Sequence, residues 1–212
     1  KGWLVGKLNE GMSAMFTMMN NARLGVAVQG LSQAERAFQK AVMHAKDRKQ
    51  GRPQIENGIG TIFDHADVRR NLLIMKALTV VSRSLCLDTA MSIDLANESG
   101  SAEIKSRAAF LIPIAKAFST DNGCRVSDIG IQVHGGLGFI ESSGVPQLFR
   151  DARITAIYEG TNGIQAMDLV NRKLSDGGAA GFRLIKELIE TEQICKKLGI
   201  IKNKFIIIGL II

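Results

Sequence analysis

The sequence has 212 residues, of which 46% are hydrophobic and 22% are charged, so the chain can bury a core and is not a disordered tail. Only 5% of the residues are aromatic and 3 are Pro, beside 8 Met and 22 Gly, which favours packed helices over a β-sandwich or barrel. The net charge of +7 comes from Lys and Arg residues spread among carboxylates, which argues against nucleic acid as the partner and fits small anions such as nucleotides.

Membrane, disulfide and metal chemistry are not expected from this sequence. No stretch reaches the roughly 18 apolar residues of a membrane span. The start, Lys1-Gly2-Trp3, resembles neither a signal peptide nor a translation start, so we expect a piece of a longer chain. The cysteines are odd in number and widely spaced, which excludes a disulfide framework and indicates a reducing compartment: Cys86, Cys124 and Cys195. Neither these cysteines nor the histidines have the spacing of metal ligands; the histidines are His44, His65 and His134.

The first predicted elements are the end of a strand and a long helix. Residues 1–10 alternate in polarity, as a strand ending in a loop does. No Pro occurs over residues 12–49, and apolar residues recur there at helical spacing. Gly25 and Gly30 on this helix are small enough to let another helix approach closely. The charged run that ends at Gly51 predicts its C-terminus.

Two more long helices follow a loop at residues 50–60. An apolar stripe predicts a helix over residues 64–97, with Asp64 as its N-cap. Another helix starts at Ser101 and runs to about residue 133, with a local kink at Pro113. Three long helices predict an all-α fold, an up-down helical bundle.

The last third of the sequence is divided into shorter segments. The sequence predicts a loop at residues 134–139, helices at residues 146–154 and 160–174, and a flexible joint at residues 177–181. Residues 182–198 form an amphipathic pattern, and the Ile-rich end 205–212 is too short to span a bilayer.

The loop His134-Gly135-Gly136-Leu137-Gly138-Phe139 is rich in glycine. It is not a Rossmann fingerprint, which must follow a strand and open a helix, because this loop follows a predicted helix. Two interpretations remain: a sharp structural turn between helices, or a backbone surface that lies against a cofactor.

The segment Tyr158-Glu159-Gly160-Thr161-Asn162 places a carboxylate at the start of a predicted helix. Such a Glu is often only a charge that the helix dipole favours. The alternative is a general base. A carboxylate that an aromatic ring and an apolar ligand shield from water acquires the raised pKa that removal of a weakly acidic C–H proton requires.

Residues 18–23 (MMNNAR), 131–139 (IQVHGGLGF) and 149–165 (FRDARITAIYEGTNGIQ) together closely resemble the acyl-CoA dehydrogenase family. The resemblance covers about residues 2–174. The version ending in TNGIQAMDLV is similar to a bacterial branch with an extra C-terminal helical region. The resemblance implies three parts: the end of the β domain (residues 1–11), the C-terminal helical bundle domain (residues 12–176), and the start of the extra helical region, truncated or irregular (residues 177–212).

The resemblance implies an FAD-dependent oxidoreductase, a flavoprotein of fatty acid metabolism, that converts an acyl-CoA to a trans-2-enoyl-CoA. Glu159 matches the base that removes the α-proton; Ala22, where some members carry the base instead, cannot serve. Arg23 would support the base and the wall of the site, and Tyr158 and Gly160 would border the thioester.

FAD is the implied cofactor. The residues that match the family's FAD contacts are Arg48 for the pyrophosphate, the loop residues Gln132, Gly135 and Gly136 for the adenosine diphosphate of a neighbouring subunit, and Thr161 and Asn162 beside the adenine or pyrophosphate. The family's N-terminal domain and most of its β domain, which hold the isoalloxazine, do not match any part of this sequence. The chain alone is therefore expected to hold half a site.

The implied partners are an acyl-CoA substrate, an electron-transfer flavoprotein or similar acceptor, and further copies of the chain in a homodimer or homotetramer, in the bacterial cytoplasm. The alternative function is a non-catalytic helical module that only oligomerises, left from a truncated gene. A DNA-associated relative of the family is a third hypothesis, and it rests on the positive charge alone.

Overall fold

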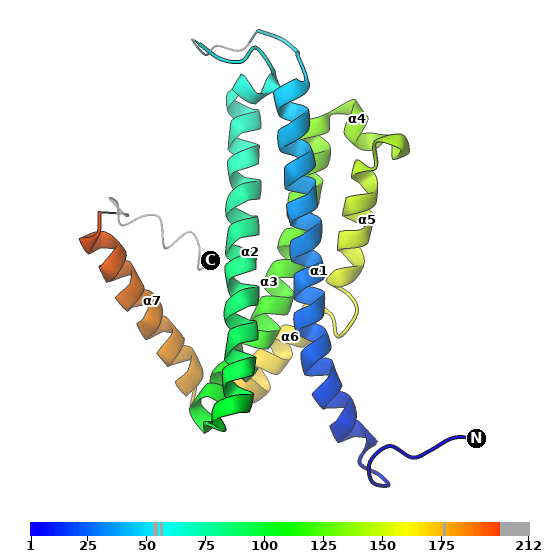
Figure 1. Cartoon of the computed structure of the whole chain (residues 1–212), viewed down its shortest axis with the longest axis vertical. Helices are drawn as coiled ribbons and strands as arrows, with labels where there is room; N and C mark the ends of the chain where they lie inside the picture. Colours follow the sequence, from blue (N-terminus) through cyan, green and yellow to red (C-terminus); the bar gives the residue numbers. More distant parts are fainter. Residues whose placement is uncertain (53–54, 56, 176, 200–212) are drawn as a thin grey trace.

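The centre of the molecule is a bundle of three long helices, α1 (Gly11–Asp47), α2 (Ala66–Ser99) and α3 (Ala102–His134). The computed structural model describes residues 1–52, 55, 57–175 and 177–199, and these contain helices and no β-strand. The three helices lie side by side and alternate in direction (Figure 1). The all-α up-down bundle expected from the sequence is confirmed.

Shorter elements complete the bundle after α3. Helix α5 (Val145–Thr155) packs on α1 and α3, and α6 (Asn162–Asp168) packs on α3 and continues as one π-helical segment, η3 (Leu169–Lys173). Short turns connect the helices: η1 (Ile62–Asp64), α4 (Gly136–Phe139) and η2 (Glu141–Ser143). The predicted glycine-rich loop thus contains one helical turn, α4, which follows Gly135 at a φ of 59°.

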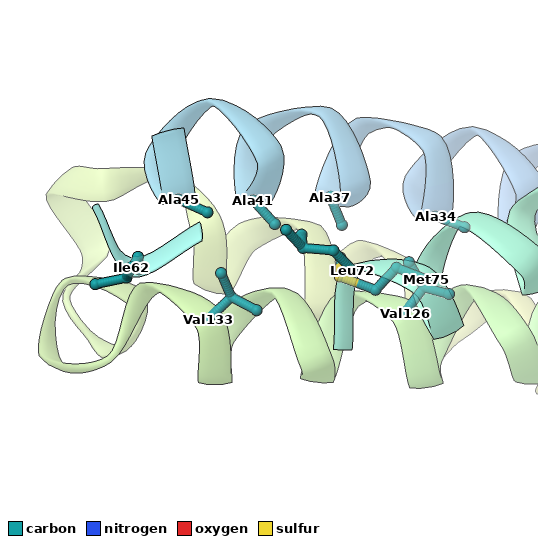
Figure 2. Close-up of a cluster of buried hydrophobic side chains, with 9 residues drawn as sticks. All are labelled: Ala34, Ala37, Ala41, Ala45, Ile62, Leu72, Met75, Val126 and Val133. Carbon is teal, nitrogen blue, oxygen red and sulfur yellow. The ribbon is translucent and has the colours of Figure 1, made fainter. Parts of the chain in front are cut away.

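The largest hydrophobic cluster is built around alanines of α1 (Figure 2). Every third or fourth residue of this helix face is Ala, so side chains of α2 and α3 fill the narrow space beside it. The buried members are Ala34, Ala37, Ala41, Ala45, Ile62, Leu72, Met75, Val126 and Val133.

Helices α1 and α3 touch backbone to backbone at Gly30. A Cβ added to Gly30 would lie 2.6 Å from the carbonyl oxygen of Ser119, and one on Gly123 would lie 2.7 Å from the carbonyl oxygen of Gly30. The prediction for Gly30 is therefore confirmed. Gly25 does not have this role, because no atom lies within 4 Å of its Cβ position.

Two local expectations from the sequence are wrong. Residues 1–10 form no strand and are exposed, since the partner strands of a sheet are not present in the described chain. Asp64 does not cap α2: it lies in η1, and its carboxylate accepts a hydrogen bond from the N–H of Gly60 at 2.7 Å. His65 precedes α2 and gives it no side-chain cap.

Helix α7 (Ala179–Lys197) leaves the lower end of the bundle at an angle (Figure 1). Arg107 of α3 holds it there with ion pairs to Glu187 at 2.6 Å and to Asp88 of α2 at 3.0 Å. The exposed apolar side chains of this segment are Phe182, Ile185, Leu188, Ile189, Ile194 and Leu198. The Ile-rich stretch 205–212 lies outside the described residues.

Among the described helices, none combines the length and the apolar character that crossing a membrane requires.

Candidate functional site

The turn that carries Glu159 connects α5 to α6 with an unusual backbone. Glu159 has a φ of 55° and Gly160 a φ of 82°, so two successive residues adopt the left-handed conformation. For a non-glycine residue this conformation costs about 1–2 kcal/mol, so surrounding contacts must stabilise it. The Glu159 side chain is half-buried.

Both carbonyl oxygens of this turn are hydrogen-bonded. Nε2 of Gln165 donates to the Glu159 oxygen at 3.2 Å and to the Gly160 oxygen at 3.1 Å, and Nζ of Lys116 donates to the Gly160 oxygen at 2.8 Å. The backbone N–H of Glu159 has no acceptor within the described part of the chain. The turn thus offers a carboxylate and, from the same residue, an N–H that is free to donate to a ligand.

Lys116 is a buried cation beside this turn. Its side chain is 0% exposed, and the ammonium group also donates to Oδ1 of Asn162 at 2.9 Å. The pKa of Lys116 is lowered to about 8, mainly by burial; the charge of Arg23 also lowers it, whereas Asp121 and Glu159 raise it. Arg23 and Glu159 therefore both lie close enough to Lys116 for their charges to act on its ammonium group.

Arg23 is bound by a buried carboxylate. It forms an ion pair with Asp168 of α6 at 2.8 Å, with 3% of each side chain exposed. The second oxygen of Asp168 lies 2.6 Å from Nε of Arg172, one turn further along the chain. The guanidinium group of Arg23 is thereby fixed at the interface between α1 and α6.

The remaining predicted residues near Glu159 have defined partners. The hydroxyl of Tyr158 donates to Oε1 of Gln29 on α1. The hydroxyl of Thr161 caps α6 by accepting from the N–H of Ile164 at 3.3 Å. The amide of Asn162 is bound by Lys116 and itself donates to Asp121 at 2.7 Å.

The other four predicted cofactor residues lie together elsewhere. Arg48, Gln132, Gly135 and Gly136 line one cleft of about 730 Å³ at the end of α1 and α3. No atom lies within 4 Å of the Cβ positions of Gly135 and Gly136, so their backbone is open to a ligand. The positive charge of Arg48 and the open backbone groups suit the phosphates of a dinucleotide.

Two histidines form one wall of this cleft. The rings of His44 and His134 stack with centroids 4.4 Å apart, and Nδ1 of His134 lies 2.7 Å from the carbonyl oxygen of Gly130. Burial lowers the pKa of both imidazoles; His134 lowers the pKa of His44 further, and Lys40 does the same for His134.

The cleft and the Glu159 turn are distant from each other. Lys116, which contacts the turn, and Gln132, which lines the cleft, are 16 positions apart on α3, which at about 1.5 Å per residue corresponds to roughly 24 Å. The structure therefore separates the predicted residues into two groups, one around Glu159 and one around Arg48.

The sequence argument missed Lys116, Asp168, Gln165 and the histidine stack. Lys116 had a usable signal, since it is a charged residue inside the apolar pattern of a predicted helix. Asp168 had none, because its partner Arg23 lies 145 positions away, and Gln165 had none, because its acceptors are backbone carbonyl oxygens, which every residue carries. The described residues contain no cluster of three His, Cys, Asp or Glu side chains suited to a metal ion.

Comparison with known proteins assigns the chain to a family. Residues 9–174 match the family model of the acyl-CoA dehydrogenase C-terminal domain. A 3-methylmercaptopropionyl-CoA dehydrogenase from Ruegeria pomeroyi is 47% identical over 93% of this chain and 35% of its own length. A butyryl-CoA dehydrogenase from Syntrophomonas wolfei is 34% identical over 82% of this chain and 30% of its length.

The solved structure of Caenorhabditis elegans ACDH-11 in complex with C11-CoA superposes with a TM-score of 0.78 at 26% identity, over 92% of this chain and 32% of that one. The chain thus spans about a third of the length of these relatives. It belongs to the acyl-CoA dehydrogenase family and covers the C-terminal helical domain.

Proposed function

We propose that this chain is the base-carrying domain of an FAD-dependent acyl-CoA dehydrogenase that converts an acyl-CoA thioester to a trans-2-enoyl-CoA. The observation that carries the proposal is the turn at Glu159, where a half-buried carboxylate and a free backbone N–H come from the same residue. Removal of an α-proton needs a base near the Cα–H and a donor on the thioester oxygen, and this residue offers both.

In this mechanism Glu159 takes the α-proton, and its N–H stabilises the negative charge that develops on the thioester oxygen. Bound FAD would supply the acceptor for the β-hydride. Gly160 and Tyr158 border the thioester. The ion pair of Arg23 with Asp168 forms the rigid wall behind the base, because both groups are buried and held by each other.

For FAD, the cleft at Arg48 fits the adenosine diphosphate part, with Arg48 opposite the pyrophosphate and Gln132, Gly135 and Gly136 as polar and backbone contacts. Thr161 and Asn162 belong to the other group and would serve the dinucleotide at the Glu159 turn. The family resemblance assigns Gln132, Gly135 and Gly136 to the FAD of a neighbouring subunit, so each chain would contribute to two FAD sites.

Such sharing requires further copies of the chain, in a dimer or tetramer. An exposed apolar stripe along α2 supports self-association, since large exposed apolar patches are typical of interfaces. Its members are Leu73, Val80, Leu87, Met91 and Leu95. An electron-transfer flavoprotein is the proposed acceptor, and the bacterial cytoplasm the proposed location, where the enzyme would serve fatty acid metabolism.

The first test is the visible absorption spectrum of the purified chain with FAD, before and after addition of butyryl-CoA and 3-methylmercaptopropionyl-CoA. These thioesters are chosen from the names of the relatives. Because the chain spans a third of those proteins, we expect no bleaching with the chain alone. Bleaching is expected once a chimera supplies the N-terminal two thirds from the Ruegeria relative.

The chimera also tests the base. Glu159→Gln should abolish bleaching while FAD remains bound, and the control Glu98→Gln, an exposed carboxylate on α2, should not. Unchanged turnover in Glu159→Gln would remove this residue as the base. A folded, oligomeric chimera that never bleaches would favour the non-catalytic oligomerisation module instead.

A further inference from the structure

Lys116 is a buried charged residue to which the mechanism above assigns no role. Its side chain is completely buried, and within the described residues it forms no ion pair with a carboxylate. Its ammonium group instead contacts the Gly160 carbonyl at 2.8 Å and the Asn162 amide oxygen at 2.9 Å. Burying an ammonium group is costly, so these two hydrogen bonds are unlike those of an ordinary surface lysine.

Both contacts reach the turn that carries Glu159. Gly160 directly follows Glu159, and Asn162 is the first residue of α6, so Lys116 connects α3 to both sides of the turn. The left-handed backbone of Glu159 is strained, because this residue is not a glycine, and it persists only where outside contacts hold it. Lys116 and Gln165 provide those contacts from different elements.

The charge of Lys116 also acts on the neighbouring groups. Glu159 from the turn, Asp121 from α3 and Arg23 from α1 are the charged groups that face it. A protonated lysine attracts the two carboxylates and makes charge-assisted hydrogen bonds, which are about twice as strong as neutral ones. Since burial lowers the pKa of Lys116 to about 8, the charge is lost in mildly alkaline solution.

We propose that Lys116 is a positioning residue, whose buried ammonium group fixes the turn that presents the carboxylate and the N–H of Glu159. The link between Lys116 and the turn stands on the contacts alone. Its consequence for catalysis rests on the proposed function.

The test uses the 212-residue chain, without cofactor or substrate. Nuclear magnetic resonance follows the Lys116 ammonium and the amides of Glu159 and Gly160 from pH 6 to pH 10. We expect all three to change with one midpoint near pH 8. A Lys116 ammonium that is still mostly protonated at pH 10, as the ordinary pKa of 10.5 requires, or turn amides that do not follow Lys116, would overturn the proposal.

A variant gives the second measurement. Lys116→Met removes the charge and the donor at similar length, and the control Lys105→Met changes an exposed lysine of the same helix. Hydrogen exchange of the Asn162 amide, which donates to the Ala156 carbonyl at 3.2 Å, should be at least about tenfold faster in Lys116→Met, while the amides of Ala37 and Ala41 in the core keep their rates. Equal acceleration everywhere, or none at the turn, would contradict a positioning role.

In the chimera described above, Lys116→Met should lower kcat about tenfold or more with KM and bound FAD unchanged, and Lys105→Met should not. Activity of the unmodified chimera should fall above pH 8. This alkaline fall of the pH–activity profile should be absent in Lys116→Met. If no form turns over, the proposed function fails, and the resonance and exchange measurements still decide the role of Lys116.

Discussion

Arg23 and Asp168 are 145 positions apart in the sequence and form a buried ion pair at 2.8 Å, with 3% of each side chain exposed. The pair joins the N-terminal half of α1 to the end of α6, the helix that follows the turn of Glu159. Breaking such a pair leaves one uncompensated charge in the interior.

Asp168→Asn tests this ion pair. We expect the free energy of unfolding to fall by about 3–5 kcal/mol, because Arg23 keeps its charge and loses the carboxylate. Urea denaturation measures the change, with Asp94→Asn on the exposed side of α2 as the control. A loss below about 1 kcal/mol would mean that water reaches Arg23 and replaces the carboxylate.

Gly30→Ala tests the contact between α1 and α3. The added Cβ would lie 2.6 Å from the backbone oxygen of Ser119, which cannot rotate away, so the helices must separate. We expect a loss of about 1–3 kcal/mol in unfolding free energy. Gly25→Ala on the same helix has open space and should instead gain up to about 1 kcal/mol. Equal effects of the two substitutions would contradict the close contact.

The stacked pair of His44 and His134 predicts a pH dependence of stability. Because burial lowers the pKa of both below 6.5, the folded state binds fewer protons than the unfolded state just below pH 6.5. Stability is then lost as the pH falls through this range and is retained above it.

Thermal unfolding at several pH values between 5 and 7.5 measures the effect. His44→Phe keeps a ring in the stack and removes one titrating group, so the loss of Tm on acidification should be smaller than in the unmodified chain. An identical loss in both proteins would show that carboxylates elsewhere cause it.

Arg48→Gln tests the proposed diphosphate cleft. Calorimetric titration of the chain with ADP should show about tenfold weaker binding in the variant, since a hydrogen bond to a charged group is lost. Arg36→Gln, an exposed arginine of the same helix outside this cleft, should bind ADP as the unmodified chain does. If both variants lose affinity equally, general electrostatic attraction explains the binding and the cleft is not a specific site.

Much of the fold could be predicted from the sequence. Helical periodicity without Pro located α1, and Ser101, whose hydroxyl accepts from the N–H of Ile104, marked the start of α3. The first residue of α2 was misplaced because Asp64 has the residue type of a helix cap but bonds to Gly60 in the preceding turn. Short-range preferences give element types reliably and element ends less so.

For the candidate site, the sequence identified Glu159, Arg48 and the loop at Gly135 by their resemblance to a family, and the roles of these residues stay predictions. Sequence spacing does not show that Arg48 and Gln132 line one cleft while Arg23 lies roughly 38 Å away on the same helix segment. The packing of α1 against α3 brings the first two together, and the length of α1 separates the third.

The sequence by itself therefore determined the helices, the bundle and the family, because these depend on local periodicity and on motifs that lie within short segments. Only the tertiary structure placed Lys116 under the Glu159 turn and Asp168 against Arg23. The physical reason is that each of these contacts joins groups from different helices, and a buried charge finds its partner only after the helices have packed.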